Sequence, residues 1–309
     1  MTISHPVTFT RTFQTKSGKD ITIGTGTGTK WKKDLSDDSV NPELVDQVLR
    51  SLNLGFRHID TAEVYNTHKE VGAAIKQAGI PREDLWITTK YCPGYRGINA
   101  PSTSPTESLN KALKELDTPY VDFFLIHQPF FTEEMTGGVT IESAWKELIE
   151  AKKQGKVRFI GVSNFAKVHL KRILAISESE EFLPVVNQIE FHPFLQNQSP
   201  DIVKFCQENN IQVEAYSPLA PLSRTEAPEL VKYLKEIGAK YNKTPAQLLL
   251  RYTLQKGIIP ITTSCQEQRI RQSLDLFDFE LTKDETTAID TIGAKSSYRA
   301  FFDVEFENL

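Results

Sequence analysis

The stretch His58-Ile59-Asp60-Thr61-Ala62-Glu63-Val64-Tyr65 decides the fold. Its first half alternates like a short buried strand, and the following segment opens a helix with a capping box formed by Thr67 and Glu70. A strand that passes through a short loop into a helix is the unit of a parallel βα fold. Such folds gather their functional side chains at the carboxyl ends of the strands. An acid and a phenol in this loop, Asp60 and Tyr65, therefore indicate a site.

The same unit recurs along the chain. Short apolar runs typical of buried parallel strands alternate with amphipathic segments that begin with a capping side chain and a proline. These helix starts are Asn41-Pro42, Ser104-Pro105, Ser199-Pro200 and Thr244-Pro245. The predicted strands are residues 21–27, 57–61, 85–90, 121–127, 157–163, 185–190, 212–217 and 257–262. Eight such units in 309 residues predict an α/β fold, a closed (β/α)8 TIM barrel, with a doubly wound open sheet as the alternative.

Both ends of the chain add to the barrel. Residues 7–13 and 21–23 are two β-type runs separated by a turn at 16–19, which predicts an N-terminal β-hairpin. The aromatic C-terminal tail, from residue 294, is predicted to lie over the barrel mouth. We find no linker or repeat and expect one domain over residues 1–309. The glycines at 24, 26 and 28 follow GxGxG rather than GxGxxG, and no helix opens directly after them, which argues against a Rossmann loop.

Composition excludes several classes of function. The net charge of -4 gives no sign of a nucleic-acid or anionic-membrane partner. Three widely spaced cysteines fit a reducing compartment, and the histidines lack the spacing of a metal site. No apolar run approaches the ~20 residues of a membrane span, and the N-terminus is unlike a signal peptide. We expect a cytoplasmic monomer without a metal.

Polar side chains stand at the ends of six predicted strands. They are Asp60 with Tyr65, Lys90 with Tyr91, His127 with Gln128, Ser163 with Asn164, Gln188 with Glu190, and Tyr216 with Ser217. A phenol, an ammonium, a carboxylate and an imidazole in one pocket form a proton-donating unit. A neighbouring Lys lowers the pKa of a phenol, which is about 10 when free. A hydrolase that uses Asp60 with Glu63 or Glu190 is an alternative, but it does not need a Lys beside the phenol.

These residues fall into motifs that resemble one enzyme family. The motifs are His58-Ile-Asp60-Thr-Ala-x-x-Tyr65, Thr88-Thr-Lys90, Leu125-Ile-His127, Ile160-Gly-Val-Ser-Asn164, Val186-Asn-Gln188-Ile-Glu190 and Ala215-Tyr216-Ser-Pro-Leu219. In this order and spacing they resemble the aldo-keto reductases over nearly the whole chain. The segments 28–31, 191–199 and 298–302 resemble, more narrowly, the yeast conjugated polyketone reductases and the related α-keto amide reductases.

The resemblance implies an NADPH-dependent carbonyl reductase. In that family Tyr65 corresponds to the general acid, Lys90 lowers the pKa of this Tyr, Asp60 holds Lys90, and His127 orients the carbonyl. The implied cofactor contacts are Gly28, Thr29, Ser163, Asn164, Gln188, Tyr216, Ser217 and Leu219, with Tyr216 stacked on the nicotinamide and Ser163, Asn164 and Gln188 at its carboxamide. A non-catalytic sensor or subunit that binds the nucleotide on the same barrel is the alternative.

The selectivity for NADPH rests on residues 261–270. Arg269, at the opening of the last barrel helix, is predicted to bind the 2′-phosphate because a guanidinium and a helix N-terminus both favour an anion. Thr263 and Ser264 add hydroxyl donors. Many relatives place a Lys in this loop, whereas this chain has Gln266. We therefore expect NADPH to be the cofactor, with a weaker preference over NADH than is usual in the family.

The small-molecule substrate is predicted to be a carbonyl compound with a second carbonyl beside the first. The predicted substrate contacts are Lys30, Trp31, Tyr91, Gln128, Phe130, Tyr298 and Arg299, with Phe131 and Phe302 completing an aromatic rim. Lys30 or Arg299 is expected to meet the second carbonyl, and Gln128 replaces an aromatic residue found in many relatives. Conjugated polyketones and ketopantoyl lactone are α-dicarbonyls that suit such a pocket. His58, His192 and Cys92 are interpreted as structural residues.

Overall fold

Eight parallel strands form a closed barrel in a computed structural model of the chain, which describes residues 7–177 and 179–307. The strands follow one another around the barrel in chain order. They are β1 (Gly24–Gly26), β2 (His58–Asp60), β3 (Trp86–Tyr91), β4 (Val121–Ile126), β5 (Val157–Ser163), β6 (Val186–Glu190), β7 (Gln212–Tyr216) and β8 (Ile259–Thr262). The predicted fold class is confirmed, and each strand lies within its predicted range to within one residue.

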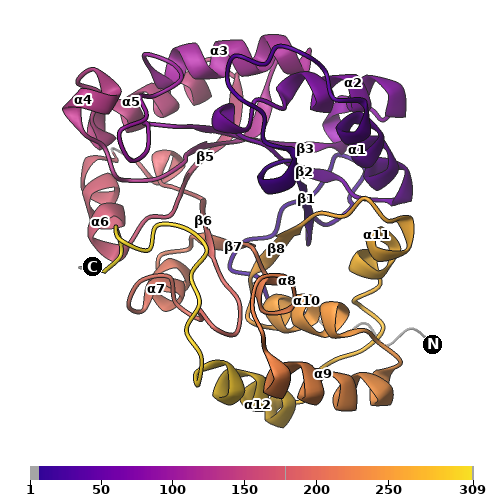
Figure 1. Cartoon of the computed structure of the whole chain (residues 1–309). Coiled ribbons are helices and arrows are strands. Elements are labelled where there is room, and N and C mark those ends of the chain that lie inside the picture. The colour runs from indigo at the N-terminus through magenta and orange to yellow at the C-terminus, as the bar shows by residue number, and fades with distance from the viewer. Residues whose placement is uncertain (1–6, 178, 308–309) are drawn as a thin grey trace. The chain divides into compact units, whose positions relative to one another are not determined.

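The described chain groups into two compact units, residues 12–187 and residues 188–307 with 7–11. In the first unit β1 to β5 pair in register, so that Asp60 lies opposite Thr88 and Lys90 opposite Leu125. Its helices lie outside these strands in Figure 1. They are α1 (Pro42–Leu54), α2 (His68–Ala78), α3 (Pro105–Leu116), α4 (Glu133–Thr136), α5 (Ile141–Lys153) and α6 (Lys167–Ile176).

The second unit holds the last strands and the C-terminal tail. Within it β7 pairs with β8, with Glu214 opposite Ile259. Its helices are α7 (Ile202–Glu208), α8 (Ala220–Ser223), α9 (Pro228–Tyr241), α10 (Pro245–Gln255), α11 (Glu267–Leu274) and α12 (Lys283–Gly293). The tail after α12 is fixed to the end of β6, because the backbone amides of Ala300 and Phe301 donate to the Glu190 carboxylate.

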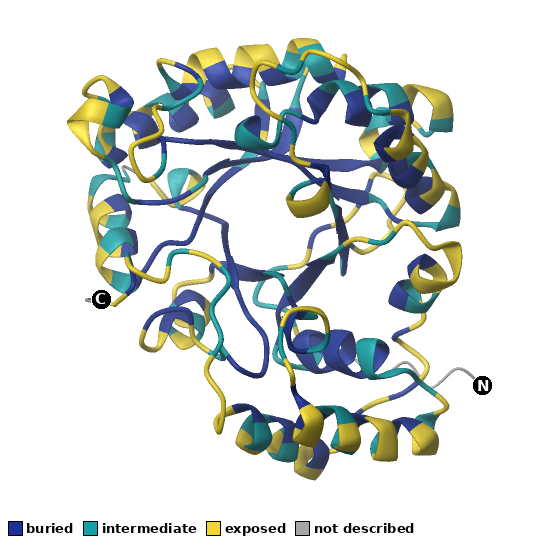
Figure 2. Ribbon diagram, viewed as in Figure 1, coloured by how far each residue is buried: buried dark blue, intermediate teal, exposed yellow. Residues whose placement is uncertain are grey.

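Burial explains the strands. Every residue of β3 and β4 is buried, and Figure 2 shows these strands in dark blue, while helices such as α3 and α5 have one buried and one exposed side. Strands covered on both faces read as nearly continuous apolar runs, which is the pattern that predicted them. Figure 2 therefore shows the core at the strands and the inner helix faces.

Three of the four predicted helix starts are confirmed. The side chains of Asn41, Ser104 and Thr244 accept backbone N–H groups of the first turns of α1, α3 and α10, each followed by a proline. The start predicted at Ser199-Pro200 is wrong. The residue Asp201 adopts a left-handed backbone and α7 begins one residue later, at Ile202.

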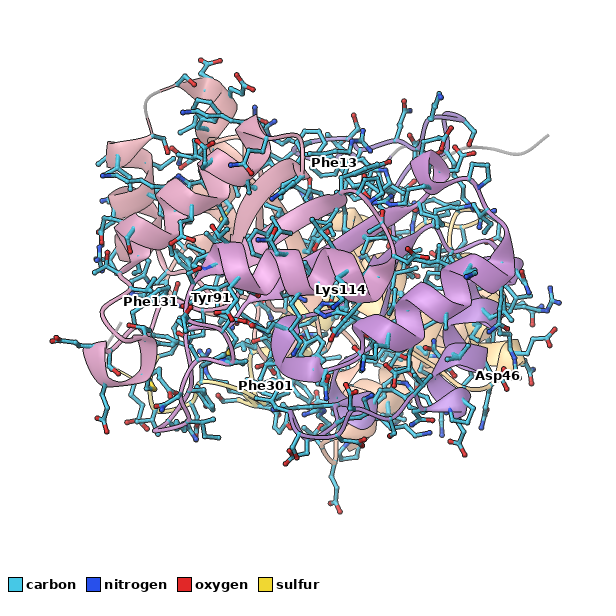
Figure 3. All side chains as sticks on the ribbon, turned by 90° about the horizontal axis from the view of Figure 1, so that it is seen from above. Phe13, Asp46, Tyr91, Lys114, Phe131 and Phe301 are labelled. Atoms are coloured by element: carbon cyan, nitrogen blue, oxygen red, sulfur yellow. The ribbon has the colours of Figure 1, made fainter. Side chains whose placement is uncertain are left out.

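Two further local predictions differ from the structure. Thr67 does not cap α2 through its side chain, because its hydroxyl bonds the Thr27 and Thr61 hydroxyls at 2.9 and 3.0 Å. The predicted N-terminal hairpin is reduced to one antiparallel bridge between Gln14 and Asp20 around the expected turn. Its apolar anchor is the Phe13 ring, which packs 5.0 Å from the Phe123 ring of β4 and is labelled in Figure 3.

Candidate active site

A buried ion pair joins β2 and β3 at their carboxyl ends. The Lys90 ammonium lies 2.8 Å from both carboxylate oxygens of Asp60 and 2.9 Å from the carbonyl oxygen of Thr61. Lys90 is fully buried and Asp60 is 4% exposed. All three donors of the ammonium group are therefore directed at oxygen atoms, and the lysine is fixed in one position. A buried pair of this kind is stable only when its remaining hydrogen bonds are satisfied, as they are here.

Tyr65 lies above this pair. It ends the 3-10 helix η2 (Glu63–Tyr65), and the Lys90 ammonium is 5.2 Å from the centre of its ring. On the other side the ring rests against Gly28, where a β-carbon would lie 2.8 Å from the ring atom Cζ. Glycine at position 28 thus allows the backbone after β1 to approach the phenol. Of the predicted cofactor contacts, Gly28 lies next to Tyr65 in this way, and Thr29 follows it as the exposed first residue of the 3-10 helix η1 (Thr29–Trp31).

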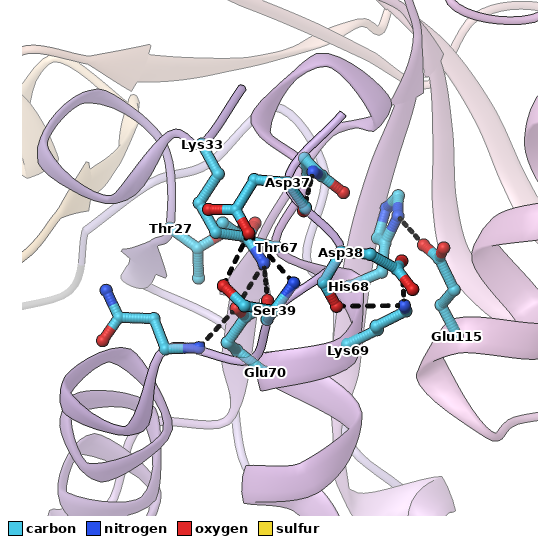
Figure 4. A network of polar contacts seen from close by, with 12 residues as sticks. Thr27, Lys33, Asp37, Asp38, Ser39, Thr67, His68, Lys69, Glu70 and Glu115 are labelled. Carbon is cyan, nitrogen blue, oxygen red and sulfur yellow. Dashed lines mark hydrogen bonds and ion pairs between the residues drawn. The ribbon is translucent and has the colours of Figure 1, made fainter. Parts of the chain in front are cut away.

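A polar network holds the backbone around Tyr65. The Lys33 amide donates to the carbonyl oxygen of Tyr65 at 3.0 Å, and the Lys33 ammonium lies 2.7 Å from the Glu70 carboxylate. Figure 4 shows how Lys33 and Glu70 meet, with Lys69 bound to Asp38 beside them. Glu70, predicted to cap α2, is instead completely buried as the partner of Lys33. The segment after β1 and the start of α2 therefore support the loop that carries the phenol.

His127 completes the group. It follows β4, and its Nε2 atom lies 3.5 Å from the Tyr65 hydroxyl, with the two rings edge to face at 5.5 Å. The backbone of His127 is tied down on both sides, because its amide donates to Tyr91 and its carbonyl accepts from the Asn164 side chain at 2.8 Å. The four predicted catalytic residues, Asp60, Tyr65, Lys90 and His127, are therefore together in the unit of residues 12–187.

The protonation states differ from one expectation. Burial raises the pKa of Tyr65 well above the usual 10.0, and the charge of Asp60 adds to this effect. Burial therefore outweighs the expected lowering of this pKa by Lys90, whose charge is offset by Asp60 at 2.8 Å. Burial and the Lys90 charge hold the pKa of His127 well below 6.5. At neutral pH the site therefore holds a protonated phenol and a neutral imidazole.

The predicted carboxamide contacts divide between the two units. In the first, Asn164 follows β5 with a left-handed backbone, φ 61°, and its side chain bonds the Ser163 hydroxyl at 3.0 Å. In the second, Gln188 donates its amide NH2 to the Glu214 carboxylate at 2.9 Å. This bond fixes which end of the Gln188 amide is the donor. Amides and hydroxyls are groups that can pair with a carboxamide, and these assignments stay predictions.

The other predicted cofactor residues lie in the second unit. The Tyr216 hydroxyl accepts from Gln198 at 3.0 Å, and its ring meets Phe301 of the tail edge to face at 5.7 Å. Ser217 has a left-handed backbone, φ 54°, and Leu219 precedes α8. Residues 217–219 therefore form a turn that connects β7 to α8.

The predicted phosphate loop fits an anion. The α11 helix begins at Glu267, so that Arg269 lies in its first turn, as expected, and is exposed. Ser264 accepts the backbone amide of Gln266, and Thr263 is exposed. An exposed guanidinium beside a helix N-terminus and two hydroxyls is a donor set suited to a phosphate group.

The predicted substrate residues differ in burial, and some of them are bound by other parts of the protein. The Lys30 ammonium lies 4.4 Å over the ring of Trp31, which is itself buried. The Gln128 amide serves the loop backbone, donating to Gly94 at 2.6 Å and accepting from Phe130. Gln128 is buried, and both ends of its amide are engaged by the protein. Phe130 packs edge to face on His169 at 5.9 Å.

Some residues of the predicted aromatic rim are buried in the protein. Tyr91 is completely buried within β3, with its ring 6.4 Å from that of Phe131, and both are labelled in Figure 3. In the second unit Tyr298 lies 5.9 Å from the His192 ring, and Arg299 donates to the carbonyl oxygen of Gln198 at 2.7 Å. Phe302 is half-buried in the tail. These contacts leave the substrate assignments as predictions.

Three further carboxylates, two of which belong to the hydrolase alternative, have partners that the sequence did not identify. Glu63 accepts the backbone amide of Cys92 at 3.2 Å, Glu190 holds the tail, and Glu214 holds Gln188. Each is bound by donors of the protein itself. They do not form the free pair of carboxylates that a hydrolase needs, so this alternative loses its support. Their partners are distant in the sequence, and no local signal could have identified them.

The remaining Cys and His side chains near these strand ends have structural partners or are buried. Burial raises the pKa of the Cys92 thiol to about 11, so that it is protonated at neutral pH and not a reactive thiolate. His58 bonds the Thr88 hydroxyl at 2.8 Å and His192 bonds Glu190 at 3.1 Å, in agreement with structural roles. Within residues 7–177 and 179–307, no three His, Cys, Asp or Glu side chains are grouped to hold a metal ion.

Comparison with known proteins identifies the family. The model of the aldo/keto reductase family matches residues 20–294. The chain belongs to the aldo/keto reductase family. It is 45% identical over 274 residues to the NADPH-dependent alpha-keto amide reductase of Saccharomyces cerevisiae, covering 87% of this chain and 85% of that protein. This match bears out the narrower resemblance seen in the sequence.

Other members of the aldo/keto reductase family are also similar to this chain. The glyoxal reductase of Bacillus subtilis is 36% identical over 250 residues, covering 81% of this chain and 83% of that protein. Among solved structures, the Bombyx mori aldo-keto reductase in complex with NADP superposes with a TM-score of 0.77 at 31% identity, over 97% of this chain and 98% of that one. The protein is thus an oxidoreductase of the carbonyl-reductase type that uses a nicotinamide cofactor. Of the helices described, none is long and apolar enough to cross a membrane.

Proposed function

We propose that the protein is an NADPH-dependent carbonyl reductase in which Tyr65 is the general acid. The observation that carries this proposal is the position of the Tyr65 hydroxyl, 3.5 Å from His127 Nε2 and beside the Asp60–Lys90 pair. In the proposed reaction Tyr65 donates its proton to the carbonyl oxygen of the substrate. The reduced nicotinamide, when bound, supplies the hydride. Positioned proton transfer of this kind contributes about 10²–10⁴-fold to the rate.

The neighbours of Tyr65 have distinct parts in this proposal. His127 is neutral, and a neutral imidazole can donate a hydrogen bond from Nε2 to the carbonyl oxygen without competing as an acid. After proton transfer Tyr65 is a phenolate, which the Lys90 ammonium, 5.2 Å from its ring, stabilises. Asp60 fixes Lys90 and keeps the charge in place. A general acid with a raised pKa holds its proton until the carbonyl oxygen becomes basic during reduction.

NADPH is the proposed cofactor, and an α-dicarbonyl the proposed substrate class. The donor groups at the start of α11, with the exposed Arg269, support the assignment of a cofactor with a 2′-phosphate. The relative from Saccharomyces cerevisiae is named as NADPH-dependent. That relative acts on an α-keto amide, and the Bacillus subtilis relative on glyoxal, both compounds with adjacent carbonyl groups. Conjugated polyketones and ketopantoyl lactone belong to the same class. The protein is proposed to act as a single-domain monomer in the cytoplasm.

The proposal is tested in one cuvette. NADPH and NADH are titrated against the intrinsic tryptophan fluorescence, and an α-dicarbonyl is then added while the reduced nicotinamide absorbance is followed. We expect tighter binding of NADPH than NADH and consumption of NADPH on addition of the dicarbonyl. Binding without consumption by dicarbonyls or aldehydes would favour a nucleotide sensor. No binding of either nucleotide would refute the cofactor assignment, and faster reduction of simple aldehydes would refute the substrate class.

A further inference from the structure

Glu63 occupies an unusual place two residues before Tyr65. It starts η2, the 3-10 helix that ends with Tyr65, yet its side chain is turned inward and only 5% of the residue is exposed. Its carboxylate accepts the backbone amide of Cys92 at 3.2 Å and the hydroxyls of Ser102 and Ser108. A buried carboxylate is costly unless its oxygens are bonded. Three donors from outside η2 offset that cost and hold the carboxylate in one place.

The partners of Glu63 lie at the end of the strand that carries Lys90 and in the loop and helix that follow it. Cys92 follows β3 directly and is two residues beyond Lys90, while Ser108 lies in α3. The backbone of η2 is itself short, with one bond from Tyr65 N–H to Ala62 and one from Asn66 N–H to Glu63. Such a short helix does not fix its own position relative to β3. The Lys33 amide holds one side of the loop, and the Glu63 side chain bonds η2 to the end of β3.

We propose that Glu63 is a positioning residue that sets the Tyr65 hydroxyl against Lys90 and His127 by tying η2 to the end of β3. This inference rests on the proposed function, in which Tyr65 is the proton donor. A displacement of about 1 Å in a reacting group can cost on the order of 10²-fold in rate. The contact between Tyr65 and His127 is already 3.5 Å, so a small outward movement of η2 separates the two groups.

Asp122 offers a matched control. It is also a fully buried carboxylate that accepts a backbone amide of β3, but at the opposite end of the strand, from Ile87 at 2.9 Å. Its other partners are Arg82 and Arg158, each at 2.8 Å. Loss of either carboxylate leaves buried donors without an acceptor and lowers stability. Only Glu63 is connected to the helix that carries Tyr65.

The experiment compares Glu63→Gln, Glu63→Ala and Asp122→Asn in the full chain. Glu63→Gln keeps an oxygen acceptor for Cys92 and is expected to hold kcat within about threefold of the parent protein, whereas Glu63→Ala lowers kcat by about 30-fold or more. The affinity for NADPH, measured by tryptophan fluorescence, stays within about twofold in both variants. Asp122→Asn lowers the thermal midpoint but leaves kcat unchanged. If Glu63→Ala does not fold, Glu63→Asp, which draws the carboxylate back by one methylene, takes its place.

A second readout does not depend on turnover. The phenolate absorbance of Tyr65, obtained as the difference from Tyr65→Phe, is titrated against pH in the cofactor-free protein. The midpoint of this titration is expected to differ between Glu63→Ala and the parent but not between Asp122→Asn and the parent. The inference is overturned if Glu63→Ala keeps kcat and the titration of the parent, or if Asp122→Asn loses kcat equally. Failure of the proposed function is recognised separately, because the parent protein itself then shows no NADPH-dependent reduction.

Discussion

At the scale of single residues, the site depends on a phenol that keeps its proton. Tyr65 would be a weak acid in water, and its surroundings make it weaker, because burial raises its pKa. Lys90 does not reverse this in the structure, since two oxygens of Asp60 share its charge. The lysine acts once the phenolate has formed, when a negative charge appears beside it. The arrangement favours a phenol that releases its proton during the reaction and not before it.

This protonation state predicts the pH dependence of reduction. Tyr65 must be protonated to act as an acid, and a group is protonated below its pKa, so a raised pKa extends the active range upward. We expect kcat for carbonyl reduction to remain level from about pH 7 to about pH 9, while alcohol oxidation, which needs the phenolate, rises throughout this range. Steady-state rates in both directions measure this. A fall in the reduction rate centred near about pH 8 would show that Lys90 does lower the pKa.

Gly28 gives a second prediction at this scale. Its backbone, φ -81° and ψ -156°, is accessible to any residue, so Gly28→Ala tests steric contact alone. The added β-carbon would lie 2.8 Å from Tyr65 Cζ, and the ring must move. We expect kcat to fall by about tenfold or more with little change in thermal stability. Equal rates for Gly28→Ala and the parent would contradict the close approach.

At the scale of elements, one carboxylate accepts two backbone amides of the tail. Glu190, at the end of β6, accepts the amides of Ala300 and Phe301, and Phe301 rests against Tyr216. Glu190→Ala leaves both amides without their acceptor, and we expect their hydrogen exchange to speed up by about tenfold or more, since a lost buried hydrogen bond costs about 1–3 kcal/mol. Amides of α10 serve as an internal reference. Unchanged exchange at residues 300 and 301 would show that the tail is held by other contacts.

Elements were predictable where the signal is local. The strands are apolar runs buried on both faces, and the helix starts at Asn41 and Ser104 are set by the capping residue and the proline after it. Ser199 carries the same pair of residues and fails, because Asp201 takes a left-handed backbone before α7. The dipeptide describes a possible helix start, but the surrounding chain decides where the helix begins.

The catalytic group was predictable for a different reason. Asp60, Lys90 and His127 stand at strand ends, and the order of strands in a parallel barrel brings such ends together. Partners across the fold could not be predicted. Gln128 bonds the carbonyl of Gly94, and Glu63 the amide of Cys92, through contacts between residues more than 25 positions apart. Sequence patterns identify chemical groups, whereas their partners depend on packing.

At the scale of the whole molecule, buried histidines couple stability to pH. His58 is completely buried, and burial lowers its pKa from 6.5 to about 4. A histidine that is neutral when folded binds its proton more readily when unfolded, so its stability contribution is complete above pH 6.5 and is lost as the pH falls toward 4. The barrel therefore weakens on mild acidification.

Urea unfolding at two pH values measures this effect. His58 alone is expected to lower the free energy of unfolding by about 2 kcal/mol between about pH 7 and about pH 5. His58→Gln keeps a polar partner for Thr88 but cannot titrate, so its free energy of unfolding should change less between the two conditions. The same loss of stability in this variant and in the parent would assign the effect to other groups.

The most direct measurement is a single-turnover comparison of Tyr65→Phe with the parent protein, with NADPH affinity measured on the same samples. The ring and its contact with Gly28 are retained, and the proton donor alone is removed. The proposed function predicts NADPH binding within about twofold of the parent and a loss of at least about 10³-fold in the rate of dicarbonyl reduction. Reduction within tenfold of the parent, or an equal loss of NADPH binding, would contradict the role of Tyr65 as the general acid.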